Sequence, residues 1–273
     1  MGGPRRLGIG FLWLNGRHYA PTVGFNGNRP PYAPARAATG TRATQETKSL
    51  TRVQLARMID HTQVRANATQ NDITELCEVA VKCGFAAVSI NPVWTAFCAK
   101  RLQNTGVGVN PTVGFPLGAN TARIKVEEAR ECVRNGATEI DMVINIGALK
   151  SGFPSFVERE IAAVVKGVQH VPVKVIIETS YLTTEEKIAA CEMAKRSGAA
   201  FVKTSTGFGR AGATAEDVAL MRQVVGGTLG IKAAGGIRSY ADAVAMITAG
   251  ATRIGTSTGV SILKEMPPEA ARD

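Results

Sequence analysis

The stretch Gly198-Ala199-Ala200-Phe201-Val202-Lys203 follows a helix-like segment, turns at a glycine and continues as a strand-like run. The same succession recurs at Gly84, Gly136 and Gly250, so the four glycines are separated by 52, 62 and 52 residues. A glycine directly after a helix adopts the left-handed conformation that ends the helix, and the chain can then enter a strand. The sequence therefore predicts a repeated helix–strand unit.

Further strand-like runs lie between these glycines, at residues 106–115, 173–178 and 230–233. Each 52-residue interval thus holds two strand–helix units of about 26 residues, a usual length for such a unit. Residues 49–264 have room for about eight of them. Alternating strands and helices form a parallel sheet, and eight units favour an α/β fold of one closed (β/α)8 TIM barrel.

An open, doubly wound sheet is the alternative. It predicts a glycine-rich fingerprint directly after the first strand. The first strand is expected near Leu55–Thr62, and Gln63-Val64-Arg65 follows it without a glycine. The closed barrel is therefore the preferred fold.

The composition excludes several classes of protein. The chain has 273 residues, 45% of them hydrophobic, which is enough to bury a core. No apolar run approaches the roughly 20 residues that span a bilayer. The five cysteines are scattered and show no metal-like spacing with the three histidines. We therefore expect a cytoplasmic protein with reduced cysteines, no metal and no membrane partner.

Residues 1–48 differ from the rest of the chain in charge. They carry seven basic residues and one acidic residue, or +6 of the net charge of +10, and the other 225 residues carry 25 − 21 = +4. We expect a disordered extension here, because this composition supports no core. An organelle transit peptide and a nucleic-acid-binding arm are the alternatives. Residues 265–273 are expected to form a C-terminal tail.

The strand-like run at 139–145 places one acidic residue on the inner face of the barrel. Period two directs Ile140, Met142 and Ile144 toward the helices, so Asp141 faces the interior. A carboxylate inside a barrel is costly unless it is paired. Asp141 is thus a candidate catalytic residue, with a structural ion pair as the alternative.

Two lysines occupy matching positions in the next strands. Lys203 and Lys232 both lie within strand-like runs among apolar residues, where lysine is rare unless it has a partner or a function. Neighbouring parallel strands are about 4.8 Å apart, so two inward lysines would lower each other's basicity. Such an amine is nucleophilic near neutral pH. Either lysine alone could instead extend toward solvent.

Small residues end the last three strands. Gly207, the pair Gly235-Gly236, and Ser257 with Thr258 follow the runs that begin near 201, 230 and 253. Barrels often bind phosphate at these loops, although tight turns alone would also use glycine. Together with the inward lysines, this favours imine chemistry on a phosphorylated carbonyl compound.

The segments that carry these residues closely resemble the deoxyribose-phosphate aldolases, which are class I aldolases with a barrel fold. The resemblance covers residues 50–264, and its strongest motif is Phe201–Phe208. The other matching stretches are Ile59-Asp60-His61-Thr62, Glu139–Val143, Lys174–Thr179 and Gly230–Arg238.

The resemblance implies a reaction and a set of roles. The family reversibly cleaves 2-deoxy-D-ribose 5-phosphate to D-glyceraldehyde 3-phosphate and acetaldehyde, a step in deoxyribonucleoside catabolism. By resemblance, Lys203 forms a Schiff base with the substrate, Lys232 tunes its amine, Asp141 relays protons and Asp60 orders that relay. The phosphate-binding positions are matched by Gly207, Gly235, Gly236, Ser257 and Thr258. The resemblance further implies no cofactor and a homodimer.

Some positions depart from the family pattern. Ser89 stands where cysteine is frequent and is expected near the mouth of the pocket, and Ala234 replaces a usual serine or proline. Two other functions stay open at this point. One is a sugar-phosphate isomerase or synthase without an imine, and the other is a nucleic-acid-binding protein built on an inactive barrel. The paired lysines and the modest charge of the barrel argue against both.

Overall fold

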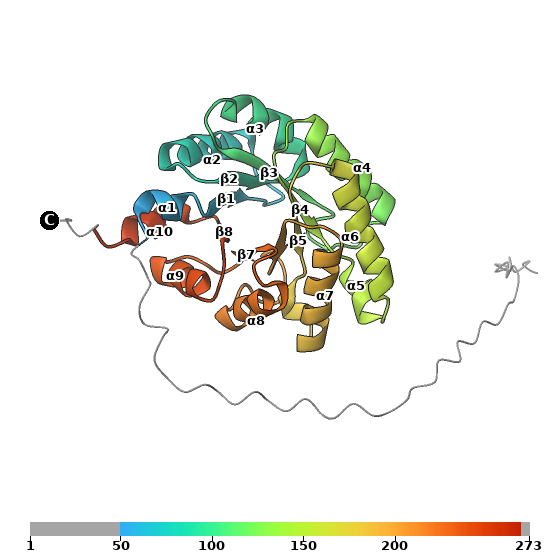
Figure 1. Cartoon of the computed structure of the whole chain (residues 1–273). Helices are drawn as coiled ribbons and strands as arrows, with labels where there is room; N and C mark the ends of the chain where they lie inside the picture. Colours follow the sequence, from blue (N-terminus) through green and yellow to red (C-terminus); the bar gives the residue numbers. More distant parts are fainter. Residues whose placement is uncertain (1–49, 269–273) are drawn as a thin grey trace, which may run out of the picture. The chain divides into compact units, whose positions relative to one another are not determined.

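The computed structural model describes residues 50–268, and the extension expected at 1–48 lies outside this range. Eight parallel strands form a closed barrel in chain order, each hydrogen-bonded to the next and β8 to β1, as predicted (Figure 1). The strands are β1 (Ile59–Gln63), β2 (Ala87–Ile90), β3 (Gly108–Val113), β4 (Ile140–Val143), β5 (Val173–Ile176), β6 (Phe201–Lys203), β7 (Gly230–Ala234) and β8 (Arg253–Thr256).

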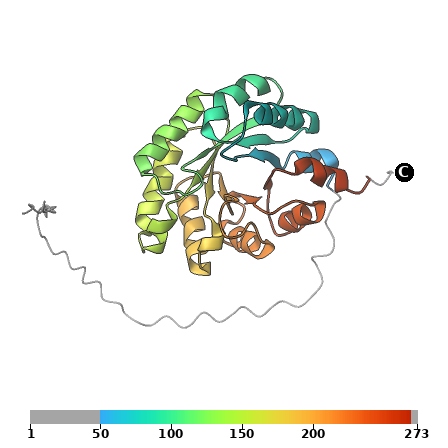
Figure 2. The ribbon, with the colours of Figure 1, turned by 180° about the vertical axis from the view of Figure 1, so that it is seen from behind.

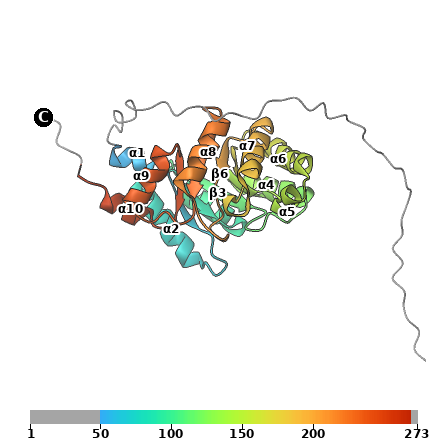
Figure 3. The same cartoon turned by 90° about the horizontal axis from the view of Figure 1, so that it is seen from below.

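Helices surround the strands, and the view from behind shows the same ring (Figure 2). Figure 3 shows the barrel from its side, with the helices outside strands β3 and β6. The helices are α1 (Arg52–Ala56), α2 (Gln70–Cys83), α3 (Thr95–Leu102), α4 (Ala122–Arg134), α5 (Ile146–Lys150), α6 (Pro154–Val168), α7 (Thr184–Arg196), α8 (Ala215–Val225), α9 (Tyr240–Thr248) and α10 (Gly259–Glu265), with 3₁₀ turns at Pro92–Trp94 and Thr179–Tyr181. Helix α10 thus ends one residue beyond the expected boundary at 264.

The repeated glycines turn the chain as predicted. Gly84 ends α2 in the left-handed conformation at φ 67°, and the other three glycines of the repeat also have positive φ. One expected boundary was wrong: the first strand begins at Ile59 rather than near Leu55. Residues 52–56 form α1 instead, because Thr51 and Gln54 make a reciprocal capping box at its N-terminus.

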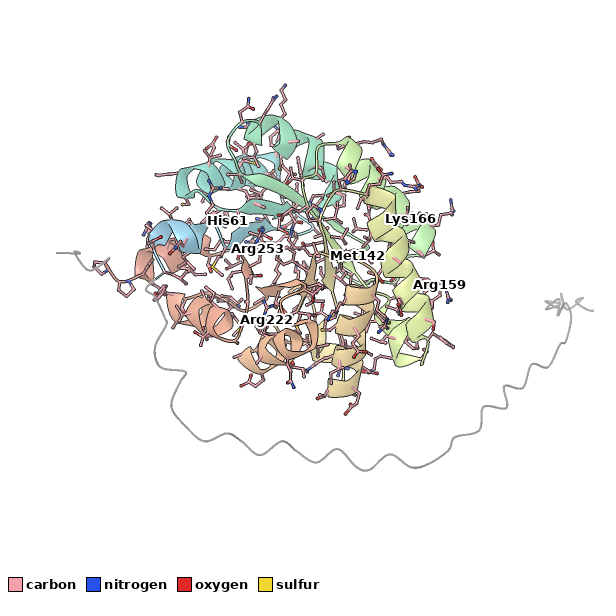
Figure 4. All side chains as sticks on the ribbon, viewed as in Figure 1. His61, Met142, Arg159, Lys166, Arg222 and Arg253 are labelled. Carbon is pink, nitrogen blue, oxygen red and sulfur yellow. The ribbon has the colours of Figure 1, made fainter. Side chains whose placement is uncertain are left out.

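The barrel separates two kinds of buried side chain. Ile140, Met142 and Ile144 are buried in the apolar layer between strands and helices, as predicted, and Figure 4 shows Met142 on that side of β4. Four of the five cysteines are buried, and all five are free. The barrel interior, in contrast, holds fully buried charged groups at strand positions where many barrels carry branched apolar residues.

None of the helices in residues 50–268 has the length and apolar character needed to cross a membrane.

Candidate active site

Three of the predicted residues meet at one carboxylate oxygen inside the barrel. The Lys203 ammonium donates a hydrogen bond to Asp141 Oδ2 at 2.6 Å, and the Lys232 ammonium donates to the same oxygen at 2.8 Å. The fourth residue joins them, because Lys232 Nζ lies 2.6 Å from Asp60 Oδ2. Sequence reasoning thus named four side chains that the fold brings into one cluster.

Strand register explains why these side chains converge. Lys203 of β6 and Lys232 of β7 are direct partners in the ladder, so both point inward at the same level. Asp141 lies across from them on β4, and Asp60 lies on β1 beside β8. The short strands and the closed barrel hold all four groups on rigid elements rather than on loops.

The electrostatics leave the two carboxylates charged. Burial alone would raise the pKa of Asp141, but the ammonium groups of Lys203, Lys232 and Lys174 hold this pKa well below its ordinary range. Burial opposes ionisation of Asp60 too, and Lys232, Lys174 and Arg253 lower its pKa nevertheless. Asp141 is therefore a carboxylate that accepts hydrogen bonds when substrate arrives.

The two lysines respond differently to the same cluster. Burial lowers the pKa of Lys203 to about 8, helped by the like charge of Lys232 and opposed by Asp141. Burial also acts against Lys232, but Asp141 and Asp60 raise its pKa above the ordinary value. Desolvation is thus the larger cause at Lys203, and the like charge that sequence reasoning invoked comes after it.

Lys203 is also the member of the cluster that reaches open space. It is 4% exposed, whereas Lys232, Asp141 and Asp60 are 0% exposed. Its side chain lines a cavity of about 370 Å³ at the C-terminal ends of the strands. A carbonyl compound in this cavity would therefore meet the amine of Lys203 first.

Most of the predicted phosphate residues line the same cavity. They are Gly207, Gly235, Gly236 and Ser257. Thr258 does not line it, because its hydroxyl lies 3.4 Å from the carbonyl oxygen of Ile237 and 3.3 Å from that of Arg238. Ser89 is not at the mouth as expected: it is 1% exposed on β2, and its hydroxyl accepts a hydrogen bond from Asn110 Nδ2 at 3.2 Å.

Two arginines at the cavity escaped sequence reasoning. Arg65 and Arg238 both contribute to its lining, at the ends of the β1 and β7 loops. Arginine suits phosphate because its planar group donates two parallel hydrogen bonds. For Arg238 the sequence did contain a signal of phosphate binding, because this arginine follows the pair Gly235-Gly236 by two residues.

A buried glutamate fixes the loop that carries Gly207. Glu178 is 1% exposed and adopts a left-handed backbone at φ 54°. Its Oε2 accepts hydrogen bonds from the backbone and the hydroxyl of Thr206, and the Thr206 hydroxyl in turn accepts one from the Phe208 amide. Sequence reasoning quoted this residue within a motif but gave it no role.

A second set of charged side chains adjoins the cluster and is called here the lower layer, because two of its three members stand at the beginnings of strands. It consists of Lys174 on β5, Glu139 just before β4 and Arg253 on β8. Figure 4 shows Arg253 toward the inside of the barrel, whereas Arg159 and Lys166 point outward from α6. Lys174 alternates with Val173 and Val175, the same pattern that singled out Lys203.

Among residues 50–268, no group of three or more His, Cys, Asp or Glu side chains is arranged to hold a metal ion.

Comparison with known proteins places the whole barrel in one family. The family described as DeoC/LacD family aldolase matches residues 54–266. The deoxyribose-phosphate aldolase of Caldanaerobacter subterraneus is 58% identical over 214 residues, covering 77% of this chain and 93% of the relative. That of Methanothermobacter thermautotrophicus is 56% identical over 215 residues, covering 78% of this chain and 96% of the relative.

A solved structure has the same fold. The tetrameric deoxyribose phosphate aldolase from Aeropyrum pernix superimposes with a TM-score of 0.74 at 34% identity, covering 78% of this chain and 91% of that one. Fold, matched span and identity agree, and the chain belongs to the DeoC/LacD aldolase family.

Proposed function

We propose that this protein is a deoxyribose-phosphate aldolase that cleaves 2-deoxy-D-ribose 5-phosphate to D-glyceraldehyde 3-phosphate and acetaldehyde through a Schiff base on Lys203. The observation that carries the proposal is the position of Lys203: its amine contacts Asp141 on one side and opens to a cavity on the other. The names and identities of the relatives support the substrate.

The lowered pKa makes the amine available at neutral pH. A pKa of about 8 leaves about one amine in ten unprotonated at pH 7, against roughly one in three thousand at the ordinary value of 10.5. The free amine attacks the C1 carbonyl of the open-chain sugar, and the resulting carbinolamine loses water to give an iminium ion. Asp141 and Lys232 stand beside the reacting nitrogen and supply the proton transfers.

The iminium ion then acts as an electron sink. A base removes the proton of the C3 hydroxyl, the C2–C3 bond breaks, and its electron pair moves into an enamine while C3 becomes the aldehyde of glyceraldehyde 3-phosphate. Protonation of the enamine at C2 and hydrolysis of the iminium ion release acetaldehyde and restore the Lys203 amine. The protonated imine provides the polarisation in this scheme, so the proposal includes no metal or cofactor.

The other residues that line the cavity suit the phosphate group. Gly207, Gly235, Gly236 and Ser257 line the cavity and can offer backbone N–H groups and a hydroxyl to a phosphate, and Arg65 and Arg238 add positive charge. Gly235 has φ 88°, and a Cβ there would lie 3.0 Å from Gly212 Cα. The loops therefore approach one another closely only with glycine at this position.

The same proposal extends to the setting of the enzyme. We place it in the cytoplasm, in the degradation of deoxyribose phosphate, as a homodimer. The Aeropyrum pernix relative is tetrameric, so the assembly is a separate question that the molar mass in solution answers.

Reductive trapping tests the chemistry. Borohydride added in the presence of acetaldehyde is expected to increase the intact mass of the folded protein by one ethyl group. An isomerase or synthase without an imine would turn over sugar phosphate and gain no mass. A folded, active protein that gains no adduct would overturn the proposal.

A further inference from the structure

Lys174 holds the side of the catalytic carboxylate that faces away from Lys203. It is 0% exposed, and its Nζ lies 3.4 Å from Asp141 Oδ1, whereas Lys203 and Lys232 both contact Oδ2. The same ammonium donates hydrogen bonds to Asn110 Oδ1 at 3.0 Å and to Glu139. Lys174 cannot touch a substrate in the cavity, because it does not line it.

Arg253 pairs in a similar way with the second buried carboxylate, that of Asp60. Its guanidinium donates to Asp60 Oδ1 at 2.7 Å, while Lys232 occupies Asp60 Oδ2 at 2.6 Å. It also donates to both oxygens of Glu139, at 3.1 and 3.2 Å. Glu139 thus links Arg253 to Lys174, and the two layers form one continuous network.

The charges of this network do not balance when every group is ionised. It contains three carboxylates, from Asp60, Glu139 and Asp141, and four basic side chains, from Lys174, Lys203, Lys232 and Arg253. The side chains of Arg253 and Glu139 are 15% and 19% exposed, but those of Lys174, Lys232, Asp60 and Asp141 are 0% exposed, and an uncompensated charge among them is costly. One proton is therefore in excess, and the network is neutral after one lysine has released it.

The contacts decide which lysine that is. Lys232 lies between Asp141 and Asp60, and Lys174 lies between Glu139 and Asp141. Among residues 50–268, Lys203 is within ion-pairing distance of one carboxylate only, that of Asp141. Arg253 does not deprotonate in proteins. Lys203 thus loses the least attraction when it becomes a neutral amine.

We propose that Lys174, together with Arg253, is a positioning residue that balances the buried carboxylates so that Lys203 is the group that gives up its proton. The inference rests on the proposed imine chemistry of Lys203. Charged groups face Lys203 from every side: Asp141, Lys232 and Asp60 directly, Lys174, Glu139 and Arg253 from the layer below, and Arg65 and Arg238 across the cavity.

Charge-altering variants of the lower layer provide the test. Lys174→Met removes one cation, so the charges of the network balance while Lys203 is still protonated. Lys203 then releases its proton less readily. The midpoint of the pH dependence of acetaldehyde trapping is therefore expected to move to higher pH. Removing an anion with Glu139→Gln has the opposite effect, and the midpoint moves to lower pH. The double variant Lys174→Met/Glu139→Gln has one basic side chain more than carboxylates, as the natural protein does. Its midpoint is therefore expected to return toward that of the natural protein.

The readout is the rate of borohydride trapping with acetaldehyde from pH 5 to 10, with circular dichroism as the check of folding. Trapping by Lys174→Met at pH 7 is expected to fall about tenfold for each unit that the midpoint moves. Asn110→Ala is the uncharged control, because it removes a hydrogen-bond partner of Lys174 without changing the number of charged groups in the network. The trapping midpoint of this variant is expected to stay in place.

The outcomes separate this inference from the proposed function. No adduct in the natural protein overturns the proposed function itself. If the natural protein forms the adduct, then single variants whose midpoints stay in place or move in the same direction overturn the role of the lower layer. If Lys174→Met does not fold, Glu139→Gln decides alone, and an unchanged or raised midpoint overturns the inference.

Discussion

Lys125 and Lys203 are both buried lysines paired with a carboxylate, yet their surroundings differ in one respect. Lys125 on α4 lies 2.8 Å from Glu160 Oε1 and donates to the carbonyl oxygens of Gly118 at 2.7 Å and Val143 at 2.8 Å. Its ammonium is therefore enclosed by one carboxylate and two carbonyl oxygens, and Lys125 is 0% exposed. Lys203 donates to Asp141 alone among the described residues, and the rest of its ammonium faces the cavity.

Burial by itself therefore does not mark a reactive lysine. Burial lowers the pKa of Lys125 as it does that of Lys203, and a carboxylate opposes the change in both. What distinguishes Lys203 is that a substrate can reach its nitrogen without breaking an existing contact. Lys125 instead ties α4 to α6 and to the end of β4, so its function is structural.

Replacing the reactive lysine produces the largest expected effect. Lys203→Met removes the nucleophile, and turnover is expected to fall by about four orders of magnitude or more while the protein stays folded. The measurement is the rate of substrate cleavage, with thermal unfolding as the control. Turnover within tenfold of the natural protein would show that Lys203 is not the nucleophile.

The matched change at the structural lysine affects stability instead. Lys125→Met leaves the Glu160 carboxylate buried without its cation, which is expected to lower the free energy of unfolding by about 3–5 kcal/mol. The kcat of the protein that remains folded should stay within about twofold. Urea unfolding and activity measured on the same sample make the comparison, and full stability with lost activity would reverse the two roles.

Removing the neighbouring ammonium tests the pH dependence. Lys232→Met takes a like charge away from Lys203 and leaves Asp141 to Lys203, and both changes raise the pKa of Lys203 above about 8. Because only the free amine reacts, the acidic limb of kcat/KM should move to higher pH. A limb that stays in place would indicate that the two ammonium groups do not interact.

The smallest effect is expected at the proposed phosphate site. Ser257→Ala removes one donor from the proposed phosphate site and is expected to raise KM about two- to tenfold, with kcat within about twofold. Thr258→Ala is the control, because the Thr258 hydroxyl faces backbone carbonyls and not the cavity. Equal effects of the two changes on KM would show that Ser257 has no role in phosphate binding that Thr258 lacks.

The sequence predicts the barrel and three members of the cluster, Asp141, Lys203 and Lys232, for the same reason, whereas Asp60 was named only by the family resemblance. A helix ended by glycine and followed by a strand recurs along the chain, and period two within each strand separates Asp141 from its apolar neighbours. Because Lys203 and Lys232 lie at matching positions of consecutive strands, their pairing in the ladder follows once the strands are aligned. These inferences require only local patterns and parallel pairing.

The missed features depend on which side chains meet across the barrel or between helices. Glu139 and Arg253 stand at the beginnings of strands, where charged residues are ordinary, and their contact joins elements that are far apart in the chain. Lys125 lies in the charged sequence of α4 and looks like a solvated residue until Glu160 of α6 is placed against it. Ser89 was misplaced because its partner, Asn110, comes from the neighbouring strand.

Open access to the nitrogen, and not burial, selects the reactive lysine. Borohydride trapping with acetaldehyde, followed by peptide mapping of the adduct, distinguishes the two. One ethylated lysine is expected, at Lys203, with Lys125, Lys174 and Lys232 unmodified. An adduct on Lys232, or one distributed among the buried lysines, would show that access to the cavity does not select the lysine.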